Sequence, residues 1–245
     1  MEFHVIGILF AAYGAAAYVF FLGVFVYAVG FVGNVPQLPK TIDSGAAGAL
    51  IPSLIVNLVL LGIFAIQHSV MARPTFKRVW TRLVPTTVER STYVLFSSLA
   101  LAALFAYWRP MPQVIWDVPA GPFALALQVL FCAGFGLVLL STFLLSHFEL
   151  FGLQQVVLRL LRREAPNPEF RTPSLYQVVS HPLYLGFVIG FWATPTMTWG
   201  HLLLAIGTTG YILIAIQLEE RNLVDTFGDR YRDYRRRVGM LLPKV

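Results

Sequence analysis

The stretch that decides the fold class is VIGILFAAYGAAAYVFFLGVFVYAVGFV, from Val5 to Val32, which contains no charged side chain. A helix rises 1.5 Å per residue, and about 20 apolar residues cross the hydrocarbon core of a bilayer. This run is therefore long enough to cross a membrane. It has no basic region before it and is longer than the apolar part of a signal peptide, so we expect a helix that is kept in the mature protein.

Similar apolar runs recur along the rest of the chain. They are Leu50–Met71, Thr92–Trp108, Pro122–His147, Pro182–Thr194 and Trp199–Leu218. Only 12% of the 245 residues are charged and 57% are hydrophobic, whereas soluble domains carry about 25% charged residues. The same balance excludes a disordered chain. We therefore predict a single membrane domain over residues 1–245, an all-α integral membrane protein with five to six transmembrane helices.

The fifth run is the uncertain crossing, because its apolar part is only about 13 residues long, below the usual range for a spanning helix. A helix that begins near Ser174 would be long enough. Pro195 separates this run from the sixth and favours a tight turn between them. We therefore predict that the last two membrane helices form a hairpin.

Basic residues indicate the orientation. Of the 18 lysines and arginines, 16 lie between the second and third runs, between the fourth and fifth runs, or after the sixth; the exceptions are Lys40 and Arg109. The positive-inside rule then places both termini in the cytoplasm, which fits a bacterial plasma membrane. The net charge of +6 is explained by topology and by attraction to anionic lipids, so we expect no nucleic-acid partner. Cys132 is the single cysteine, which excludes an intramolecular disulfide, and we expect no metal site.

A first motif, Tyr176-x4-His181-Pro182-x-Tyr184-x-Gly186, precedes and enters the fifth run. Proline suits the first turn of a helix, where its missing N–H costs nothing. The free N–H groups of such a helix start attract a carboxylate or a phosphate, and His181 could donate to the same anion. Gly186 would allow the close approach of a ligand or of the neighbouring hairpin helix.

A second motif, Glu219-Glu220, ends the sixth run and is followed by apolar residues at helical spacing: Leu223, Phe227, Tyr231, Tyr234 and Val238. Basic residues occupy the other positions, which predicts a cytoplasmic amphipathic helix at the C-terminus. Two adjacent carboxylates at a membrane boundary repel each other unless a cation or hydroxyl groups pair with them. A ligand with an amine, a sulfonium or a ribose would provide such a partner.

Histidines also fall at the predicted ends of other runs. His68 ends the second run, and His147 ends the fourth, where Glu149 follows it. With His181, three segments that are distant in sequence each bring an ionisable group to the same membrane side. A lone histidine at a helix end is more often structural than functional, but the convergence of several favours a functional site.

The second half of the chain resembles membrane methyltransferases of the isoprenylcysteine carboxyl methyltransferase type, through the His-Pro motif, the paired glutamates and the aromatic tail. The first half is similar to the methanethiol S-methyltransferases of the NnrU-like group. The stretches that carry this second similarity are Gln67-His68-Ser69-x-Met71-Ala72-Arg73-Pro74, Glu89-Arg90-Ser91-Thr92-Tyr93 and His147-Phe148-Glu149-Leu150-Phe151-Gly152. One position departs from the isoprenylcysteine pattern, since Ser180 stands where an arginine usually precedes the His-Pro pair.

The resemblance implies that S-adenosylmethionine methylates methanethiol at the cytoplasmic end of the helix bundle and yields dimethyl sulfide and S-adenosylhomocysteine. It also implies that residues 172–245 form most of the cofactor site. The residues expected to bind the cofactor are Tyr176, His181, Pro182, Tyr184, Gly186, Glu219 and Glu220.

A thiol must lose its proton before it can attack, so a base within hydrogen-bond reach is expected. The candidates for this base are His68 and His147, with Glu149, Tyr93 and Arg73 as orienting groups. Three alternatives stay open at this point. They are a haem-binding isomerase or redox protein with histidine ligands, a methyltransferase for a lipid or prenylcysteine acceptor, and a scaffold without activity.

Overall fold

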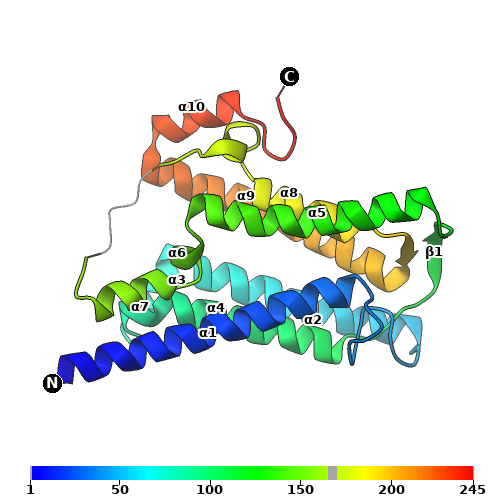
Figure 1. Cartoon of the computed structure of the whole chain (residues 1–245), viewed down its shortest axis with the longest axis horizontal. Coiled ribbons are helices and arrows are strands. Elements are labelled where there is room, and N and C mark those ends of the chain that lie inside the picture. Colours follow the sequence, from blue (N-terminus) through cyan, green and yellow to red (C-terminus); the bar gives the residue numbers. More distant parts are fainter. Residues whose placement is uncertain (1, 165–169, 245) are drawn as a thin grey trace. The chain divides into compact units, whose positions relative to one another are not determined.

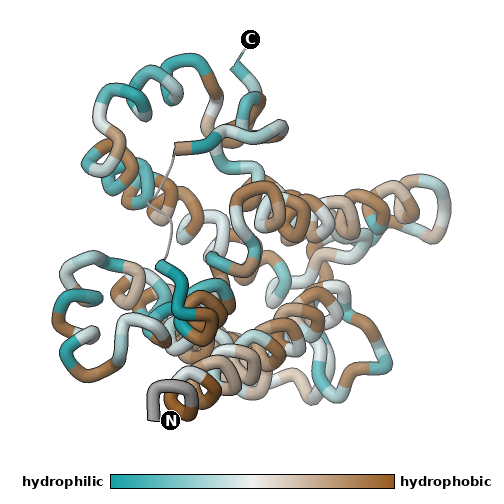
Figure 2. The backbone as a smooth tube through the Cα atoms, turned by 60° about the vertical axis from the view of Figure 1, so that its left-hand side comes forward, coloured by the Kyte–Doolittle hydropathy of each residue, from teal (hydrophilic) through white to brown (hydrophobic). Residues whose placement is uncertain are grey.

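The computed structural model describes residues 2–164 and 170–244, and side chains from residue 5 onward. The described chain is mostly helical, with almost no sheet (Figure 1). Five of its helices are long and apolar enough to cross a membrane: α1 (Glu2–Val32), α2 (Leu50–Ala72), α4 (Thr86–Tyr107), α5 (Pro122–Leu145) and α9 (Trp199–Phe227). Figure 2 shows apolar residues along these helices and a mostly hydrophilic C-terminal end. The prediction of an all-α integral membrane protein is confirmed.

The remaining elements are short. They are α3 (Pro74–Trp80), α6 (His147–Leu150), α7 (Leu153–Leu160), the 3-10 helix η1 (Ser174–Gln177), α8 (Pro182–Trp192), α10 (Asp229–Arg237) and the strands β1 (Val114–Asp117) and β2 (Thr196–Thr198). The described residues divide into two compact units. Among the described residues, unit 1 contains residues up to Arg109 and residues 146–164, and unit 2 contains the rest.

Unit 1 is built on α1, α2 and α4. Near one end of these helices, the buried Trp108 donates from its indole nitrogen to the carbonyl of Ile42 at 3.1 Å and meets Phe31 edge-on. Asn57, fully buried in α2, bonds to both the backbone N–H and the carbonyl of Arg109 at 2.8 Å. These bonds satisfy backbone groups that follow the end of α4, where no helical partner is left.

The third predicted span begins earlier than its apolar run, at Thr86 rather than Thr92. Pro85 precedes the helix, and the first turns of α4 carry polar residues that are buried inside unit 1. Ser91, for example, is fully buried, and its hydroxyl donates to the carbonyl of Gly152 at 3.3 Å. Hydropathy does not detect this segment because it faces protein rather than lipid.

The fourth predicted span ends at Leu145, before His147. Ser146 leaves the helical conformation, with φ −178° and ψ 80°, and His147 then begins the separate short helix α6. The prediction that His147 ends a membrane helix is therefore wrong. The break places His147 in unit 1, whereas α5 belongs to unit 2.

In unit 2, α8 begins at Pro182 and has 11 residues, so it does not have the earlier start near Ser174 that would have made it long enough to span. A helix of this length covers about 16 Å, roughly half of the hydrocarbon core. The helix nevertheless lies antiparallel to α9, since His181 pairs with Glu220 and the indole of Trp192 donates to Thr209 at 2.9 Å. The hairpin is confirmed.

Helix α8 is much shorter than its hairpin partner α9, and a non-helical segment connects the end of α8 to the start of α9. Residues 193–198 continue along α9 to its start, where Thr198 caps the helix by accepting a hydrogen bond from the N–H of His201. Within this segment β2 pairs antiparallel with β1, in a register that sets Trp116 opposite Met197. The pairing gives the backbone of this non-helical segment hydrogen-bond partners within the protein.

Gly186 packs α8 against α5 rather than against the hairpin partner α9. A β-carbon on Gly186 would lie 2.6 Å from the carbonyl oxygen of Gly134 and 2.8 Å from the backbone nitrogen of Val138. Gly190 faces Phe135 in the same way. Small residues spaced by four along a membrane helix allow this close backbone contact.

At the C-terminus the predicted amphipathic helix is divided in two. Helix α9 continues past the paired glutamates to Phe227, and Gly228, with φ +57°, ends it and turns the chain into α10. A left-handed backbone favours glycine at this turn. The predicted apolar face is kept across the break, because Leu223 and Phe227 of α9 pack with Tyr231, Tyr234 and Val238.

Candidate functional site

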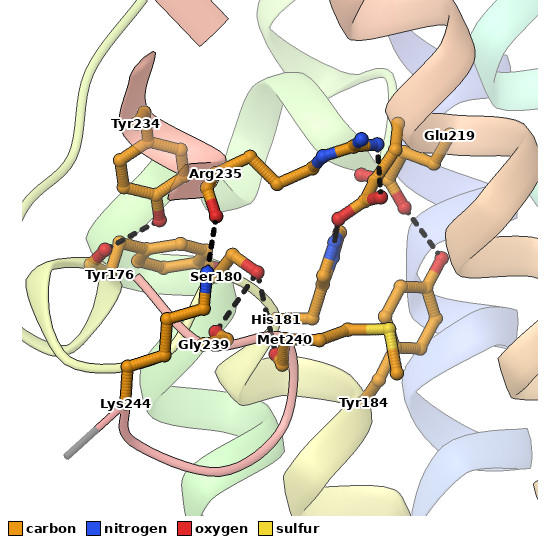
Figure 3. Close-up of polar contacts among 11 residues, drawn as sticks. Tyr176, Ser180, His181, Tyr184, Glu219, Tyr234, Arg235, Gly239, Met240 and Lys244 are labelled. Carbon is orange, nitrogen blue, oxygen red and sulfur yellow. Dashed lines mark hydrogen bonds and ion pairs between the residues drawn. The ribbon is translucent and has the colours of Figure 1, made fainter. Parts of the chain in front are cut away.

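The predicted cofactor residues of unit 2 meet at the start of α8. His181 precedes the helix and is 5% exposed, and its Nε2 lies 3.4 Å from Oε1 of Glu220. The other carboxylate oxygen of Glu220 accepts a hydrogen bond from Arg235 of α10 at 3.0 Å. Three segments thus bring a histidine, a carboxylate and a guanidinium together (Figure 3).

The neighbouring glutamate has a different partner. The hydroxyl of Tyr184, one turn into α8, donates to Oε2 of Glu219 at 2.8 Å. Both glutamates therefore have partners within the chain, so a ligand is not required to keep these two carboxylates stable side by side. The cationic and hydroxyl partners that the sequence analysis expects for these carboxylates are thus found within the chain.

A second layer of tyrosines supports this arrangement. The Tyr234 hydroxyl donates to the carbonyl of Tyr176 at 2.5 Å, and the Tyr176 hydroxyl donates to the carbonyl of Ser141 at 3.5 Å. Burial raises the pKa of Tyr234 to about 12, and it raises the pKa of Tyr176 and of Tyr231 further. These phenols therefore stay protonated at neutral pH and act as hydrogen-bond donors.

The Tyr231 hydroxyl is a buried polar atom for which no hydrogen-bond partner is found among the described residues. The negative charges of Glu220 and Glu219 contribute to its raised pKa, which places it in the field of both carboxylates. A buried hydroxyl without a partner costs free energy unless something binds it. It is therefore an available contact for a polar ligand.

The C-terminal tail folds back onto the start of α8. The backbone N–H of Ser180 donates to the carbonyl of Gly239 at 2.8 Å, and that of His181 to the carbonyl of Met240 at 3.1 Å. The Ser180 hydroxyl is 3.2 Å from the same Gly239 carbonyl (Figure 3). The C-terminal tail therefore occupies the N–H groups of Ser180 and His181, and Pro182 has no N–H to offer. An anion at the start of α8 would have to bind N–H groups that lie later in the helix.

The predicted catalytic residues lie in unit 1. The Tyr93 hydroxyl of α4 is 2.8 Å from Nε2 of His68, and the Ser97 hydroxyl, one turn further along α4, is 3.1 Å from Nδ1. Phe64 stacks on the imidazole with a centroid distance of 5.2 Å. The hydroxyl partners hold the ring of His68 in a defined orientation.

His147 has an aromatic environment with one hydroxyl partner. It is 4% exposed, and its Nε2 is 2.7 Å from the hydroxyl of Tyr18 in α1. The rings of Tyr18, Phe148 and Phe151 meet the imidazole edge-on or nearly so. Burial lowers the pKa of His147 below its ordinary value of 6.5, so the imidazole is neutral at pH 7 and can accept a proton.

The two histidines are connected through one apolar cluster. Met71, Tyr93 and Val94 form its buried core, against which Phe21 and Phe151 pack. Tyr93 is a partner of His68 and Phe151 contacts His147, so the structure brings together three of the five predicted catalytic residues. Of the two histidines, His147 is buried and His68 is half-buried.

The other two predicted orienting groups are not brought to the histidines. Arg73 lies between α2 and α3, and its side chain makes no hydrogen bond or ion pair within the part of the chain that the structure describes. Glu149 is exposed, and within the described residues only its backbone forms hydrogen bonds. Among the same residues, no group of three or more acidic, histidine or cysteine side chains could hold a metal ion.

Sequence reasoning missed Tyr18, Ser97 and Arg235, which all contact predicted residues. Tyr18 and Ser97 stand inside apolar runs, where a polar side chain is unusual and signals a partner within the bundle. Arg235 stands in a basic segment whose charges are already explained by the orientation in the membrane. No local pattern distinguishes it from the arginines beside it in the sequence.

The fold and these buried clusters define a class of protein: an all-α integral membrane protein with histidine, tyrosine and carboxylate groups paired inside its two units. The chain is 58% identical to "Methanethiol S-methyltransferase" of Mycobacterium tuberculosis over 233 residues, which is 94% of each chain. It is 53% identical to "Methanethiol S-methyltransferase 1" of Bradyrhizobium diazoefficiens, over 94% of this chain and 81% of the relative. The chain therefore belongs to the methanethiol S-methyltransferase family.

A more distant relative is "Nurim" of Rattus norvegicus, 31% identical over 71% of this chain and 70% of its own. The two proteins belong to the same wider family. No protein-family model matches the chain, and no solved structure is significantly similar to it.

Proposed function

We propose that this protein methylates methanethiol with S-adenosylmethionine and forms dimethyl sulfide and S-adenosylhomocysteine. The observation that carries the proposal is the 58% identity, over 94% of both chains, with a relative named for methanethiol methylation. A coverage this complete means that the similarity extends over both units rather than over one of them alone.

The residues of unit 2 fit the methyl donor. The amino-acid part of S-adenosylmethionine carries an ammonium and a carboxylate, and this site offers groups of both signs: Glu219 and Glu220 against Arg235 and His181. The unpartnered hydroxyl of Tyr231 offers a further contact close to the carboxylates. In the proposal, Glu220 and Glu219 bind the ammonium or the ribose, and His181 binds the carboxylate.

The remaining predicted cofactor residues shape this site. Pro182 begins α8 and directs His181 toward Glu220, whereas Tyr184 orients Glu219. Tyr176 fixes α10 through its bond with Tyr234. Gly186 lets α8 lie close against α5, so its role is to position the helix rather than to contact the ligand.

When bound, S-adenosylmethionine supplies an electrophilic methyl group on a sulfonium sulfur. The chain must then remove the thiol proton, because a thiol is mostly protonated at neutral pH; the cysteine side chain, for reference, has a pKa of about 8.5. His147 suits this task since burial keeps it neutral, and the Tyr18 hydroxyl orients its ring. His68, held by Tyr93 and Ser97, is the second candidate for the base.

The membrane setting suits this reaction. Methanethiol and dimethyl sulfide are small and apolar, so both can pass through the bilayer. Aromatic rings surround the imidazole of His147. In general, a water-poor setting favours the reaction of a thiolate with a sulfonium, because the charges cancel as the bond forms. We further propose that both termini face the cytoplasm, since 16 of the 18 basic residues fall in segments on that side.

Isolated membranes test the proposal. Membranes that contain the protein are incubated with methyl-labelled S-adenosylmethionine and either methanethiol or a prenylcysteine, and the headspace gas is analysed. The proposal predicts label in dimethyl sulfide only when methanethiol is present. Labelled prenylcysteine methyl ester without labelled dimethyl sulfide would contradict the choice of acceptor, and a Soret band on the purified protein would favour a haem protein instead.

A further inference from the structure

The two basic residues outside the three basic segments lie near the same end of α4. The Lys40 ammonium donates to the carbonyl of Ala106 at 2.7 Å, although 66 positions separate them. Arg109 follows three residues after Ala106, just beyond the end of α4. Its positive charge is one cause, after burial, of a lowered pKa for Lys40, as expected for two cations held close together.

This cation pair has no acidic partner among the described residues. The ion pairs of unit 1 do not include Lys40 or Arg109, and the hydrogen bonds of Arg109 to Asn57 use its backbone. Asp43, the acidic residue closest in sequence to Lys40, accepts a hydrogen bond from Asn34. Two neighbouring cations without a counter-ion repel each other, which an anion bound between them would relieve.

An apolar groove begins beside the same cations. It has a volume of about 470 Å³ and is lined by Val19, Gly23 and Tyr27 of α1 and by Ala102 and Ala106 of α4, among others. Tyr27 and Ala106, at its end, both contact Lys40: the tyrosine hydroxyl donates to the Lys40 carbonyl at 2.8 Å. From Tyr27 the groove follows α1 for eight residues to Val19, about 12 Å along the helix.

We propose that this groove and the pair formed by Lys40 and Arg109 bind one phospholipid with an anionic headgroup. The acyl chain lies in the groove between α1 and α4, and the phosphate lies between the two cations. Tyr27 has the position that aromatic residues favour at membrane interfaces, with its ring toward the apolar groove and its hydroxyl at the polar end. The two parts of the site thus match the two parts of such a lipid.

Gly23 provides a sharp test of the apolar part. Gly23 lines the groove, and a β-carbon added to it would meet no atom within 4 Å, so Gly23→Phe introduces a ring beside the groove without a clash at its β-carbon. Gly62, in α2, has the same open surroundings but does not line the groove, so Gly62→Phe is the matched control. Arg109→Gln tests the polar part, and it leaves the backbone bonds to Asn57 and the Lys40 bond to Ala106 in place.

The experiment is native mass spectrometry of the purified full chain in detergent with equal amounts of phosphatidylglycerol and phosphatidylcholine. The wild type is expected to keep one phosphatidylglycerol in preference to phosphatidylcholine. Arg109→Gln should reduce that preference roughly fivefold, since one basic residue contributes about that factor at an anionic surface, and Lys40→Arg should keep it. Gly23→Phe should lose the retained lipid, and Gly62→Phe should keep it.

Two results would overturn the proposal. One is equal retention of the two lipids by the wild type, and the other is unchanged lipid retention in Gly23→Phe. Circular dichroism of each variant verifies that the helices are intact. Because every variant is compared with a control that is also folded, a loss of lipid cannot be attributed to unfolding.

Discussion

His181 and Glu220 are 39 positions apart, and the Nε2 of the histidine lies 3.4 Å from the carboxylate, which also accepts a hydrogen bond from Arg235. The carboxylate is mostly buried between one cationic and one imidazole partner. Any change at Glu220 therefore alters the charge balance of the whole cluster at the start of α8. This makes it the most informative single position in unit 2.

Glu220→Gln keeps the shape of the side chain but removes its charge. If Glu220 binds the ammonium or the ribose of S-adenosylmethionine, the dissociation constant should rise roughly tenfold or more, because hydrogen bonds to charged groups contribute about 1.5–3 kcal/mol. Titration calorimetry with S-adenosylhomocysteine measures this change. Asp229→Asn is the control, since Asp229 pairs with Arg232 on an exposed surface where such pairs contribute little. Equal affinities in both variants would remove Glu220 from the cofactor site.

His147→Ala should reduce turnover about 10²–10⁴-fold with little change in cofactor affinity, because general-base catalysis contributes about that factor. Tyr18→Phe should reduce turnover by less, since it removes only the hydroxyl at 2.7 Å that orients the ring. The matched control is Tyr13→Phe, in the same helix, which removes a bond to Thr92 instead. The rate of dimethyl sulfide formation measures all three. Wild-type turnover in His147→Ala would leave His68 as the base.

The His68 assignment has its own test. Tyr93→Phe removes the hydroxyl 2.8 Å from Nε2 of His68 but keeps the ring that packs with Met71 and Val94. If His68 takes the thiol proton, turnover should fall and the acid limb of the pH–rate profile should move. A merely structural tyrosine would lower the melting temperature and leave the shape of that profile unchanged.

The lowered pKa of His147 predicts how stability depends on pH. Below its ordinary pKa of 6.5 the unfolded chain takes up a proton at this residue, whereas the folded protein resists protonation until a lower pH. The unfolded state then binds more protons, so acid destabilises the folded state. Between pH 7.5 and pH 5.5 the wild type should lose more in melting temperature than His147→Gln. Parallel losses in the two proteins would contradict the pKa direction.

Gly186→Ala tests the role of the glycine in packing. The added β-carbon would lie 2.6 Å from the carbonyl oxygen of Gly134 in α5. This atom belongs to the backbone, so it cannot relieve the clash by a change of rotamer. We expect a destabilisation of about 1–3 kcal/mol, which a lowered melting temperature in detergent would report. Gly136 lies on α5 in open surroundings, so Gly136→Ala should leave the melting temperature unchanged or raise it slightly. An unchanged melting temperature in Gly186→Ala would mean that the two helices separate more easily than their contact indicates.

The sequence predicted the membrane helices well because a helix that faces lipid must be apolar along its whole length. It did not predict their ends where those ends are buried in protein. The start of α4 carries Ser91, which is hidden against Gly152, and hydropathy treats such a segment as a loop. The break at Ser146, which separates His147 from α5, likewise has no hydropathy signal.

Within the site, sequence patterns identified residues that act through local motifs but not their partners across helices. His181 and Glu220 were found because each stands in a recognisable motif. The contacts of Arg235 with Glu220 and of Tyr18 with His147 depend on how distant segments pack, and no spacing along the chain encodes them. Arg73 and Glu149 stand near a histidine in the sequence, but their side chains contact neither His68 nor His147 among the described residues, and their roles stay predictions.

The measurement that tests the central claim most directly uses purified protein, methyl-labelled S-adenosylmethionine and methanethiol, with both products quantified. The proposal predicts one labelled dimethyl sulfide for each S-adenosylhomocysteine formed by the wild type, and neither product above background in a variant that combines His147→Ala with Glu220→Gln. Labelled dimethyl sulfide at the wild-type rate in that variant would contradict the assigned residues. If the wild-type protein binds the cofactor and keeps its helices intact but forms no labelled dimethyl sulfide, the proposed function itself would be contradicted.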